Sequence, residues 1–201
     1  MGSLLGILTA KRHPDYIEKY VGISQVVGGP ETEKQCYEYC YKTAIERGNK
    51  KAIRKLKQIK EPPYDDWKKG LQVRSALSNK FGASVKNGGL PSLYFKRMLL
   101  SHEYTIFDIY KFLKGFSFSL DCLWPEIMKM NLLKEVDNLT MPIYFFLGKH
   151  DYSAPSLLAE EFLSNLKTSQ KQIVWFAESA HMCNLEEQEK FTANLEHVLS
   201  L

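Results

Sequence analysis

An acidic residue and a histidine follow two apolar runs late in the sequence. Asp151 ends the stretch 148–151, and His181 comes thirty residues after it. A carboxylate that accepts a hydrogen bond from an imidazole N–H fixes the tautomer of the ring and stabilises its charged form. With a nucleophile, such a pair performs acyl transfer, because the histidine moves the proton. We therefore predict that Asp151 and His181 are the acid and the base of a nucleophile–histidine–acid triad.

The two residues must be positioned by the apolar runs that precede them. These runs, 141–147 and 172–177, have the length of strands and are rich in β-branched or aromatic residues, as buried parallel strands are. Open α/β sheets build their sites at the carboxyl ends of such strands. This placement favours a catalytic role for Asp151 over the alternative, in which it only caps a turn or the helix predicted at 156–166.

The period of the apolar residues divides the chain into two parts. Residues 1–30 and 138–201 alternate between strands and helices, and the first strand is predicted from Tyr20 to Val27. Residues 31–137 show helical periods, with breaks at 62–63 and 82–91, and we expect four to six helices and no strand there. Parallel strands require crossover connections. The predicted fold class is therefore α/β, a small three-stranded parallel sheet with a large helical insertion. The outer helices are predicted at 2–11, 156–166 and 186–199.

Composition and charge restrict the classes of partner. A net charge of +4 on 201 residues requires no polyanion. The basic run at 50–60 lacks interleaved aromatic residues, so we predict a solvated helix face and no nucleic-acid partner. No apolar run is long enough to cross a membrane, and no membrane partner is expected.

Cysteine and histidine usage predicts neither a disulfide framework nor a metal site. Cys36 and Cys40 are one helical turn apart and are predicted to be packed thiols, which favours a reduced, cytoplasmic location. His150 and His181 lack a third ligand at a suitable spacing, so no metal and no cofactor are expected. The remaining histidines have no such context and are predicted to lie on the surface or in the helical insertion; they are His13, His102 and His197.

The residues around these motifs resemble the C-terminal two thirds of an α/β-hydrolase, closest to the proline-iminopeptidase-like branch of the serine hydrolases. The resemblance implies a partial α/β-hydrolase fold, in which 1–30 and 138–201 belong to the core and 31–137 is the lid over the substrate pocket. Seven aromatic residues of this lid are predicted to line the pocket or, for most of them, to form the lid core. The matching stretches are Gly2 to Gly6, Arg12 to Asp15, Tyr20 to Gly22, Pro142 to Tyr152, Pro155, Trp175 to Phe176, Glu178 to His181 and Glu187 to Phe191. The aromatic residues are Tyr37, Tyr39, Trp67, Tyr94, Phe116, Phe118 and Trp124.

The same resemblance leaves the nucleophile without a position in this chain. In the family the serine stands in a G-x-S-x-G turn, whose last glycine matches Gly2 and whose fourth residue matches Met1. The serine is then expected immediately before Met1, as in a miscalled start, a disrupted gene or a trimmed chain. Ser3 falls on the following helix and is not expected to be the nucleophile. The chain alone is therefore predicted to be inactive.

Three functions stay open on this evidence. The first is a serine hydrolase acting on esters, amides or the N-terminal residues of short peptides, once the missing part completes it. The second is a non-catalytic remnant that binds a partner or dimerises through the exposed edge strand from Tyr20 to Val27. With so much of the sheet missing, a monomer is expected to expose apolar surface and to associate. The third, a dehalogenase or epoxide hydrolase with an aspartate nucleophile, is disfavoured because the matching stretches favour the serine branch.

Overall fold

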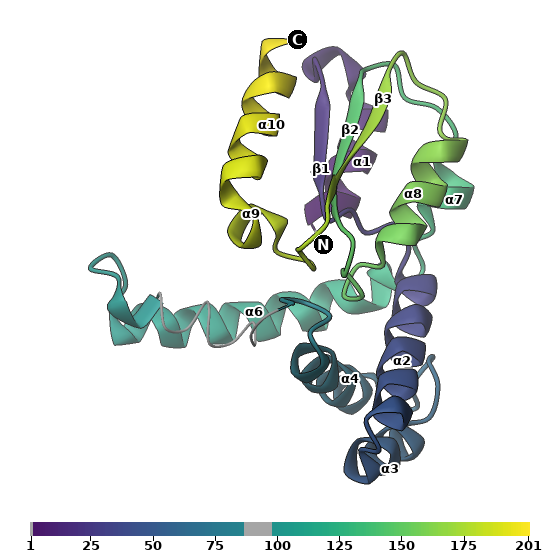
Figure 1. Ribbon diagram of the computed structural model, residues 1–201, viewed down its shortest axis with the longest axis vertical. Coiled ribbons are helices and arrows are strands. Elements are labelled where there is room, and N and C mark those ends of the chain that lie inside the picture. The colour runs from purple at the N-terminus through teal and green to yellow at the C-terminus, as the bar shows by residue number, and fades with distance from the viewer. Residues whose placement is uncertain (1, 87–97) are drawn as a thin grey trace.

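Three parallel strands form the sheet of this protein, in the order β1-β2-β3 (Figure 1). The computed structural model describes residues 2–86 and 98–201. The strands are β1 (Tyr20–Ile23), β2 (Ile143–Gly148) and β3 (Lys171–Phe176). All six residues of β2 are buried, as expected for a central parallel strand that is covered on both faces. The predicted α/β class with a small parallel sheet is confirmed.

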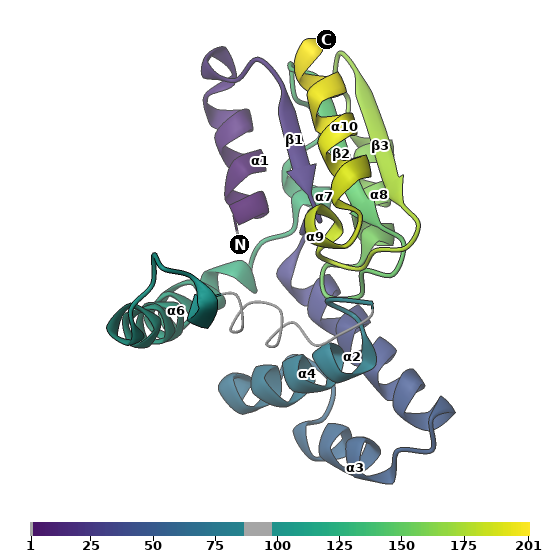
Figure 2. The same ribbon diagram turned by 60° about the vertical axis from the view of Figure 1, so that its left-hand side comes forward.

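Alternate side chains of β2 enter two different cores. Phe145 and Leu147 pack on one face with α1, α7 and α8, whereas Tyr144 and Phe146 pack on the other with α9 and α10. Figures 1 and 2 show α10 on one side of the sheet and α1 and α8 on the other. The sheet is therefore the middle of three layers. The outer helices are α1 (Gly2–Arg12), the short 3-10 helix η1 (Pro14–Tyr16), α7 (Leu132–Glu135), α8 (Ser156–Asn165), α9 (Cys183–Glu186) and α10 (Gln188–Ser200).

The insertion between β1 and β2 is helical, as predicted. Helices α2, α3 and α4 share a core of their own, to which Cys40, Leu56 and Leu77 contribute one residue each. The lysines of α3 face solvent opposite Leu56, which is the solvated face predicted for the basic run. Of the predicted break at 82–91, the part from residue 87 onward lies outside the described residues. The helices are α2 (Gly29–Glu46), α3 (Lys50–Ile59), α4 (Trp67–Phe81) and α6 (Ile106–Ile127). No described helix combines the length and hydropathy that a membrane span requires.

The first strand is shorter than predicted. β1 stops at Ile23 and does not continue to Val27. The reason is the backbone of Ser24, whose φ of 47° lies in the left-handed region and cannot continue an extended strand. The residues after Ile23 therefore leave the strand, and the predicted continuation of the strand over 24–27 is wrong.

Candidate functional site

The predicted acid and base are in contact. His181 Nδ1 lies 2.9 Å from Asp151 Oδ2. The side chain of Asp151 is 0% exposed, whereas that of His181 is 29% exposed. A carboxylate that engages Nδ1 leaves Nε2 as the ring nitrogen that can exchange a proton with a reacting group. The loops after β2 and β3 thus bring together the two residues that a triad needs, although their catalytic role stays a prediction.

The second oxygen of Asp151 is held by the turn that leads into α8. Oδ1 accepts hydrogen bonds from the backbone N–H groups of Ser153, at 2.9 Å, and of Ala154, at 2.8 Å. The capping role considered as the alternative for Asp151 is therefore present beside the histidine contact. Because one oxygen is engaged by the turn, the other is directed at His181, and the carboxylate has little freedom to rotate.

Gly148 allows the acid and histidine loops to approach each other. A Cβ atom added to Gly148 would lie 2.0 Å from the carbonyl oxygen of Ala180 and 2.6 Å from that of Ser179. Both atoms belong to the backbone and cannot rotate away. The His150 N–H also donates to Ser179 O at 3.0 Å. A glycine at the end of β2 is therefore a steric requirement for the contact between Asp151 and His181.

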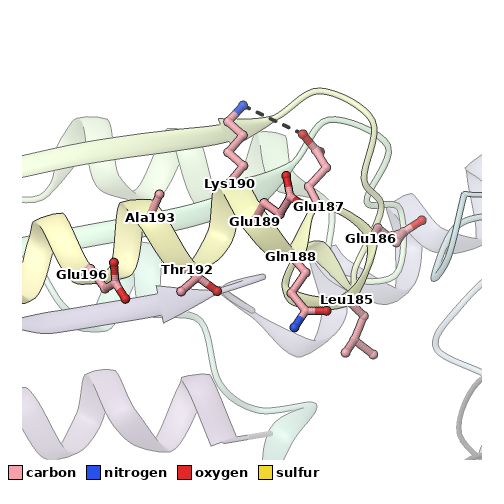
Figure 3. A pocket seen from close by; sticks show the side chains of 9 residues that line it. All are labelled: Leu185, Glu186, Glu187, Gln188, Glu189, Lys190, Thr192, Ala193 and Glu196. Carbon is pink, nitrogen blue, oxygen red and sulfur yellow. Dashed lines mark ion pairs between the residues drawn. The ribbon is translucent and has the colours of Figure 1, made fainter.

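Two glutamates at the junction of α9 and α10 hold the histidine loop. Glu186 Oε2 accepts from the N–H of Ala180 at 2.8 Å, and Glu187 Oε2 accepts from the Ser179 hydroxyl at 2.7 Å. Figure 3 shows both glutamates beside a surface hollow of about 950 Å³ that residues of 185–196 line. Neither Asp151 nor His181 lines this hollow. We assign it no part in the chemistry, because the acid and the base lie outside it and two of its carboxylates, Glu186 and Glu187, are engaged by the histidine loop.

The environment of His181 makes the ring easier to protonate. Burial acts to lower the pKa of His181, but the charge of Asp151 and its hydrogen bond outweigh burial, and Glu186 adds to their effect. The net result is a pKa above the ordinary value of 6.5. A histidine with a raised pKa is a stronger proton acceptor, as a general base requires.

The other candidate residues of the chain provide neither a nucleophile nor a metal site among the described residues. Cys183 is fully buried, and burial raises the pKa of its thiol to about 12, so the thiol is protonated and unreactive at neutral pH. Ser3 lies in α1, and its hydroxyl accepts a hydrogen bond from the N–H of Val26 at 3.1 Å. Met1 lies outside the described residues. Within 2–86 and 98–201, no group of three or more His, Cys, Asp or Glu side chains is arranged to hold a metal ion.

Two of the predicted lid aromatic residues lie within or next to the core of α2, α3 and α4. Tyr37 belongs to this core, as predicted, and donates to Leu56 O at 3.2 Å. Tyr39 packs against the same core, and its ring stacks on that of Tyr152, beside Asp151, with centroids 4.0 Å apart. The Cys36 thiol also donates to Tyr152 O at 2.9 Å. Helix α2 therefore contacts the acid loop directly.

Four of the other aromatic residues lie on α4 or α6. Trp67 stacks with Trp124 at 6.0 Å, and these two rings and Phe116 line a groove of about 640 Å³. Phe118 is 70% exposed and Phe116 is also exposed, so neither belongs to the lid core that was favoured for most of the seven aromatic residues. Tyr94 lies outside the described residues.

Two residues that contact the peptide of His181 have no signature in the sequence pattern. The hydroxyl of Ser24 donates to His181 O at 2.7 Å, and the N–H of His181 donates to Ser84 O at 3.1 Å. Ser24 stands at position 3 of the stretch 22–26, which has the first glycine of a G-x-S-x-G turn but valine in the last position. Neither serine is adjacent to His181 in sequence, so only the folded chain reveals the contacts.

Known proteins with a similar sequence or structure identify the fold of this chain. No protein-family model matches the chain. The probable aminopeptidase YbaC of Bacillus subtilis (strain 168) is 28% identical over 202 residues, which cover 96% of this chain and 61% of that protein. Among solved structures, MGS-M2, an α/β-hydrolase enzyme from a Medee basin deep-sea metagenome library, has a TM-score of 0.56 at 14% identity and covers 100% of this chain. The chain has the α/β-hydrolase fold.

Further likeness to α/β-hydrolases agrees with the resemblance in sequence. The proline iminopeptidase of Mycobacterium smegmatis has a TM-score of 0.55 at 13% identity, over 98% of this chain and 62% of that one. The chain spans about three fifths of the length of the proteins it matches, 61% of YbaC and 62% of MGS-M2. In an α/β-hydrolase the acid precedes the histidine in the chain, as Asp151 precedes His181.

Proposed function

We propose that this chain supplies the acid and the base of a serine hydrolase of the aminopeptidase-like or esterase-like type. The observation that carries this function is the contact of His181 Nδ1 with a fully buried Asp151 carboxylate, 2.9 Å away. The similarity to a probable aminopeptidase along 96% of the chain supports it. The substrate is a small ester or amide, or a short peptide.

Each residue of the pair has a separate step in the proposed reaction. A serine hydroxyl attacks the substrate carbonyl, and His181 Nε2 takes the hydroxyl proton as the new C–O bond forms. His181 then returns this proton to the leaving alcohol or amine as the C–O or C–N bond breaks. Water repeats the attack on the acyl-enzyme and restores the serine. Asp151 orients His181 and stabilises its positive charge throughout.

The serine of this reaction lies outside the 201 residues. No G-x-S-x-G sequence occurs in the chain. Ser3 belongs to α1 and its hydroxyl is hydrogen-bonded to the turn after β1. The chain alone is therefore proposed to lack hydrolase activity and to gain it when a segment with the serine turn completes the sheet.

Residues 31–137 are proposed to be the lid of this hydrolase, except for α7, which packs in the core of the sheet. Helices α2, α3 and α4 have a core separate from that of the sheet. Helix α2 contacts the loop of Asp151 through Cys36 and Tyr39, so movement of these helices would reach the acid directly. Residues 1–30 and 138–201 then form the C-terminal part of the hydrolase core.

The test compares two proteins: the 201-residue chain, and a version extended at its N-terminus by the residues that the DNA upstream of Met1 encodes in frame. We expect a fluorophosphonate probe to label the extended version and not the shorter chain. In the extended version, Asp151→Asn should lower hydrolysis of a nitrophenyl ester about 10⁴-fold, because the amide imposes the wrong tautomer on His181. His197→Gln, on the exposed face of α10, is the control and should leave the rate unchanged. A stop codon in frame before any Gly-x-Ser would refute the function, and an adduct on the shorter chain lost in Ser3→Ala would refute the position of the serine.

A non-catalytic binding module is the second candidate. Among the described residues β1 pairs with β2 alone, so one edge of β1 has no strand partner, and Ile23 on it is 40% exposed. Such an edge recruits another strand, here from a second copy of the chain. Failure of the fluorophosphonate probe on every version, together with a stable dimer, would favour this function over the hydrolase.

A further inference from the structure

Ser24 has a backbone conformation that its residue type does not favour. Its φ is 47°, and within 2–86 and 98–201 only Lys60, with a φ of 60°, is another non-glycine residue with a positive φ. Glycine adopts this region without steric cost, whereas a residue with a Cβ does not. A serine that is kept in the left-handed region therefore points to a use for its hydroxyl group.

The hydroxyl of Ser24 is buried and directed at the histidine loop. Ser24 is 4% exposed, and its Oγ donates to the carbonyl oxygen of His181 at 2.7 Å. Its N–H donates to Phe146 O at 3.0 Å, which continues the ladder between β1 and β2 by one residue. The backbone N–H of Ser24 is thus bound to the sheet, and its side chain is bound to His181, 157 residues further along the chain.

The peptide units on both sides of the His181 Cα are held by a serine. Ser24 Oγ contacts the carbonyl, and the N–H donates to Ser84 O at 3.1 Å. Ser84 in turn approaches the acid loop, because its Oγ lies 2.6 Å from that of Ser153. Among the described residues, the imidazole ring has a side-chain hydrogen bond to Asp151 only. The position of the ring therefore depends on where these serines hold the backbone.

We propose that Ser24 is a positioning residue that holds the His181 backbone where the ring reaches Asp151. Without the hydroxyl, the carbonyl of His181 loses a buried donor, and the loop gains freedom to move away from β1. The contact between Nδ1 and Oδ2 then lengthens. The consequence for catalysis rests on the proposed hydrolase function, but the contact itself exists in the chain without it.

The test is an NMR titration of the 201-residue chain and its Ser24→Gly variant. Glycine accepts the left-handed backbone, so this change removes the hydroxyl and leaves the turn unstrained. The His181 resonance is assigned by its loss in His181→Gln. We expect the measured pKa of His181 to fall by about half a unit in Ser24→Gly, because the ring moves away from the Asp151 charge. Asp151 and Glu186 are the two carboxylates that raise this pKa, and both are retained.

Lys60→Gly is the matched control, because it relaxes the other positive φ far from His181 and should leave the His181 pKa unchanged. If Ser24→Gly folds poorly, Ser24→Ala is titrated in its place, since it removes the same hydroxyl and keeps the Cβ. An unchanged His181 pKa in the Ser24 variant that is titrated would overturn the positioning role.

Enzyme kinetics separate this inference from the proposed function. In an active extended version, Ser24→Gly should lower kcat about tenfold and leave KM unchanged. If the pKa falls but no version hydrolyses an ester, Ser24 positions His181 and the hydrolase function fails. If the extended version is active and the pKa and kcat are both unaffected by Ser24→Gly, the hydrolase function stands and the role of Ser24 is refuted.

Discussion

At the scale of single residues, Asp151 combines a structural and a chemical contact in one carboxylate. One oxygen accepts two backbone N–H groups from the turn before α8, and the other faces His181. An isolated buried carboxylate is costly, and these three donors compensate it. Within 2–86 and 98–201, the His181 ring is hydrogen-bonded to no other side chain, so its orientation depends on that of Asp151.

The raised pKa of His181 makes stability depend on pH. A group whose pKa is higher in the folded than in the unfolded chain stabilises the fold below its unfolded value, here 6.5, and this stabilisation disappears as pH rises through the folded value. We therefore expect His181→Gln to lower the Tm more at about pH 5.5 than at about pH 9, by about 2 °C or more. Thermal unfolding followed by circular dichroism checks this. His197→Gln, which is exposed, should show no such difference between the two pH values, and a larger effect of His181→Gln at the higher pH would contradict the expected sign.

At the scale of elements, the site is made by the ends of strands and not by the strands themselves. β2 and β3 run in register, with Gly148 opposite Phe176, so the loops that leave them start at the same level of the sheet. Because Gly148 has no side chain, the backbone of the histidine loop can pass closer to β2 than any Cβ atom at this position would allow. The register of β2 and β3 and the close passage of their loops therefore decide how close Asp151 and His181 come.

Gly148→Ala tests this close passage. The new Cβ would meet backbone carbonyls at 2.0 and 2.6 Å, so the two loops must separate. We expect a loss of about 1–3 kcal/mol in the free energy of unfolding, measured in urea, together with a lower pKa of His181. Gly115→Ala in α6 is the control, since nothing lies within 4 Å of its added Cβ and alanine favours a helix. Equal stability of Gly148→Ala and the native chain would contradict the steric requirement.

The helices of the insertion are joined by a buried ion pair. Arg74 on α4 donates from Nε to Glu33 Oε2 on α2 at 3.1 Å and from Nη2 to Glu33 Oε1, and the Tyr64 hydroxyl donates to Glu33 Oε2 at 3.2 Å. The two charged side chains are 8% and 3% exposed. The pair therefore depends on both partners being present.

Arg74→Met should leave the Glu33 carboxylate uncompensated and destabilise the chain by about 3–5 kcal/mol in urea unfolding. The double variant Arg74→Met with Glu33→Leu should recover most of this loss, because no buried charge is left. The exposed pair of Lys60 and Asp65 provides the control, and Lys60→Met should have little effect. A double variant no more stable than Arg74→Met would show that packing, and not the charge, accounts for the loss.

At the scale of the whole molecule, β1 and α6 are two elements that expose apolar side chains. β1 is an edge strand among the described residues, and α6 has no buried residue along its 22 residues and carries apolar side chains such as Phe107 and Phe118. Figure 1 shows α6 extending sideways from the sheet. Surfaces of this kind promote association. The chain is therefore expected to bind a copy of itself or a completing segment.

Light scattering of the purified chain should detect a mass above the 23.2 kDa of one chain at concentrations of about 50 µM. If β1 forms the interface, Ile23→Lys should restore the monomer, because a lysine on an edge strand opposes strand pairing. Phe118→Lys on α6 is the matched change on the other surface and should leave the dimer intact. The reverse result would move the interface to α6, and a monomer at every concentration would refute association.

Much of the fold was predictable because the burial of one face of a helix or strand makes apolar residues recur at a regular spacing in the sequence. The apolar runs at 141–147 and 172–177 predicted β2 and β3 to within two residues, and helical periods predicted the insertion. The strand from Tyr20 was predicted too long, since a positive φ at Ser24 leaves no mark on hydropathy. Residue type also did not tell which of the seven lid aromatic residues are core residues; Phe116 and Phe118 are exposed, because an apolar side chain is buried only if a neighbouring element covers it.

The sequence by itself determined the α/β class, the three parallel strands and the choice of Asp151 and His181, since these follow from local period and chain order. The tertiary structure alone decided that the two side chains lie 2.9 Å apart, that Gly148 must lack a side chain and that Ser24 reaches across 157 residues to His181. Such contacts depend on how loops distant in the chain close on one another. Loop closure is set by the packing of the whole sheet and its helices, which no local pattern of residues encodes.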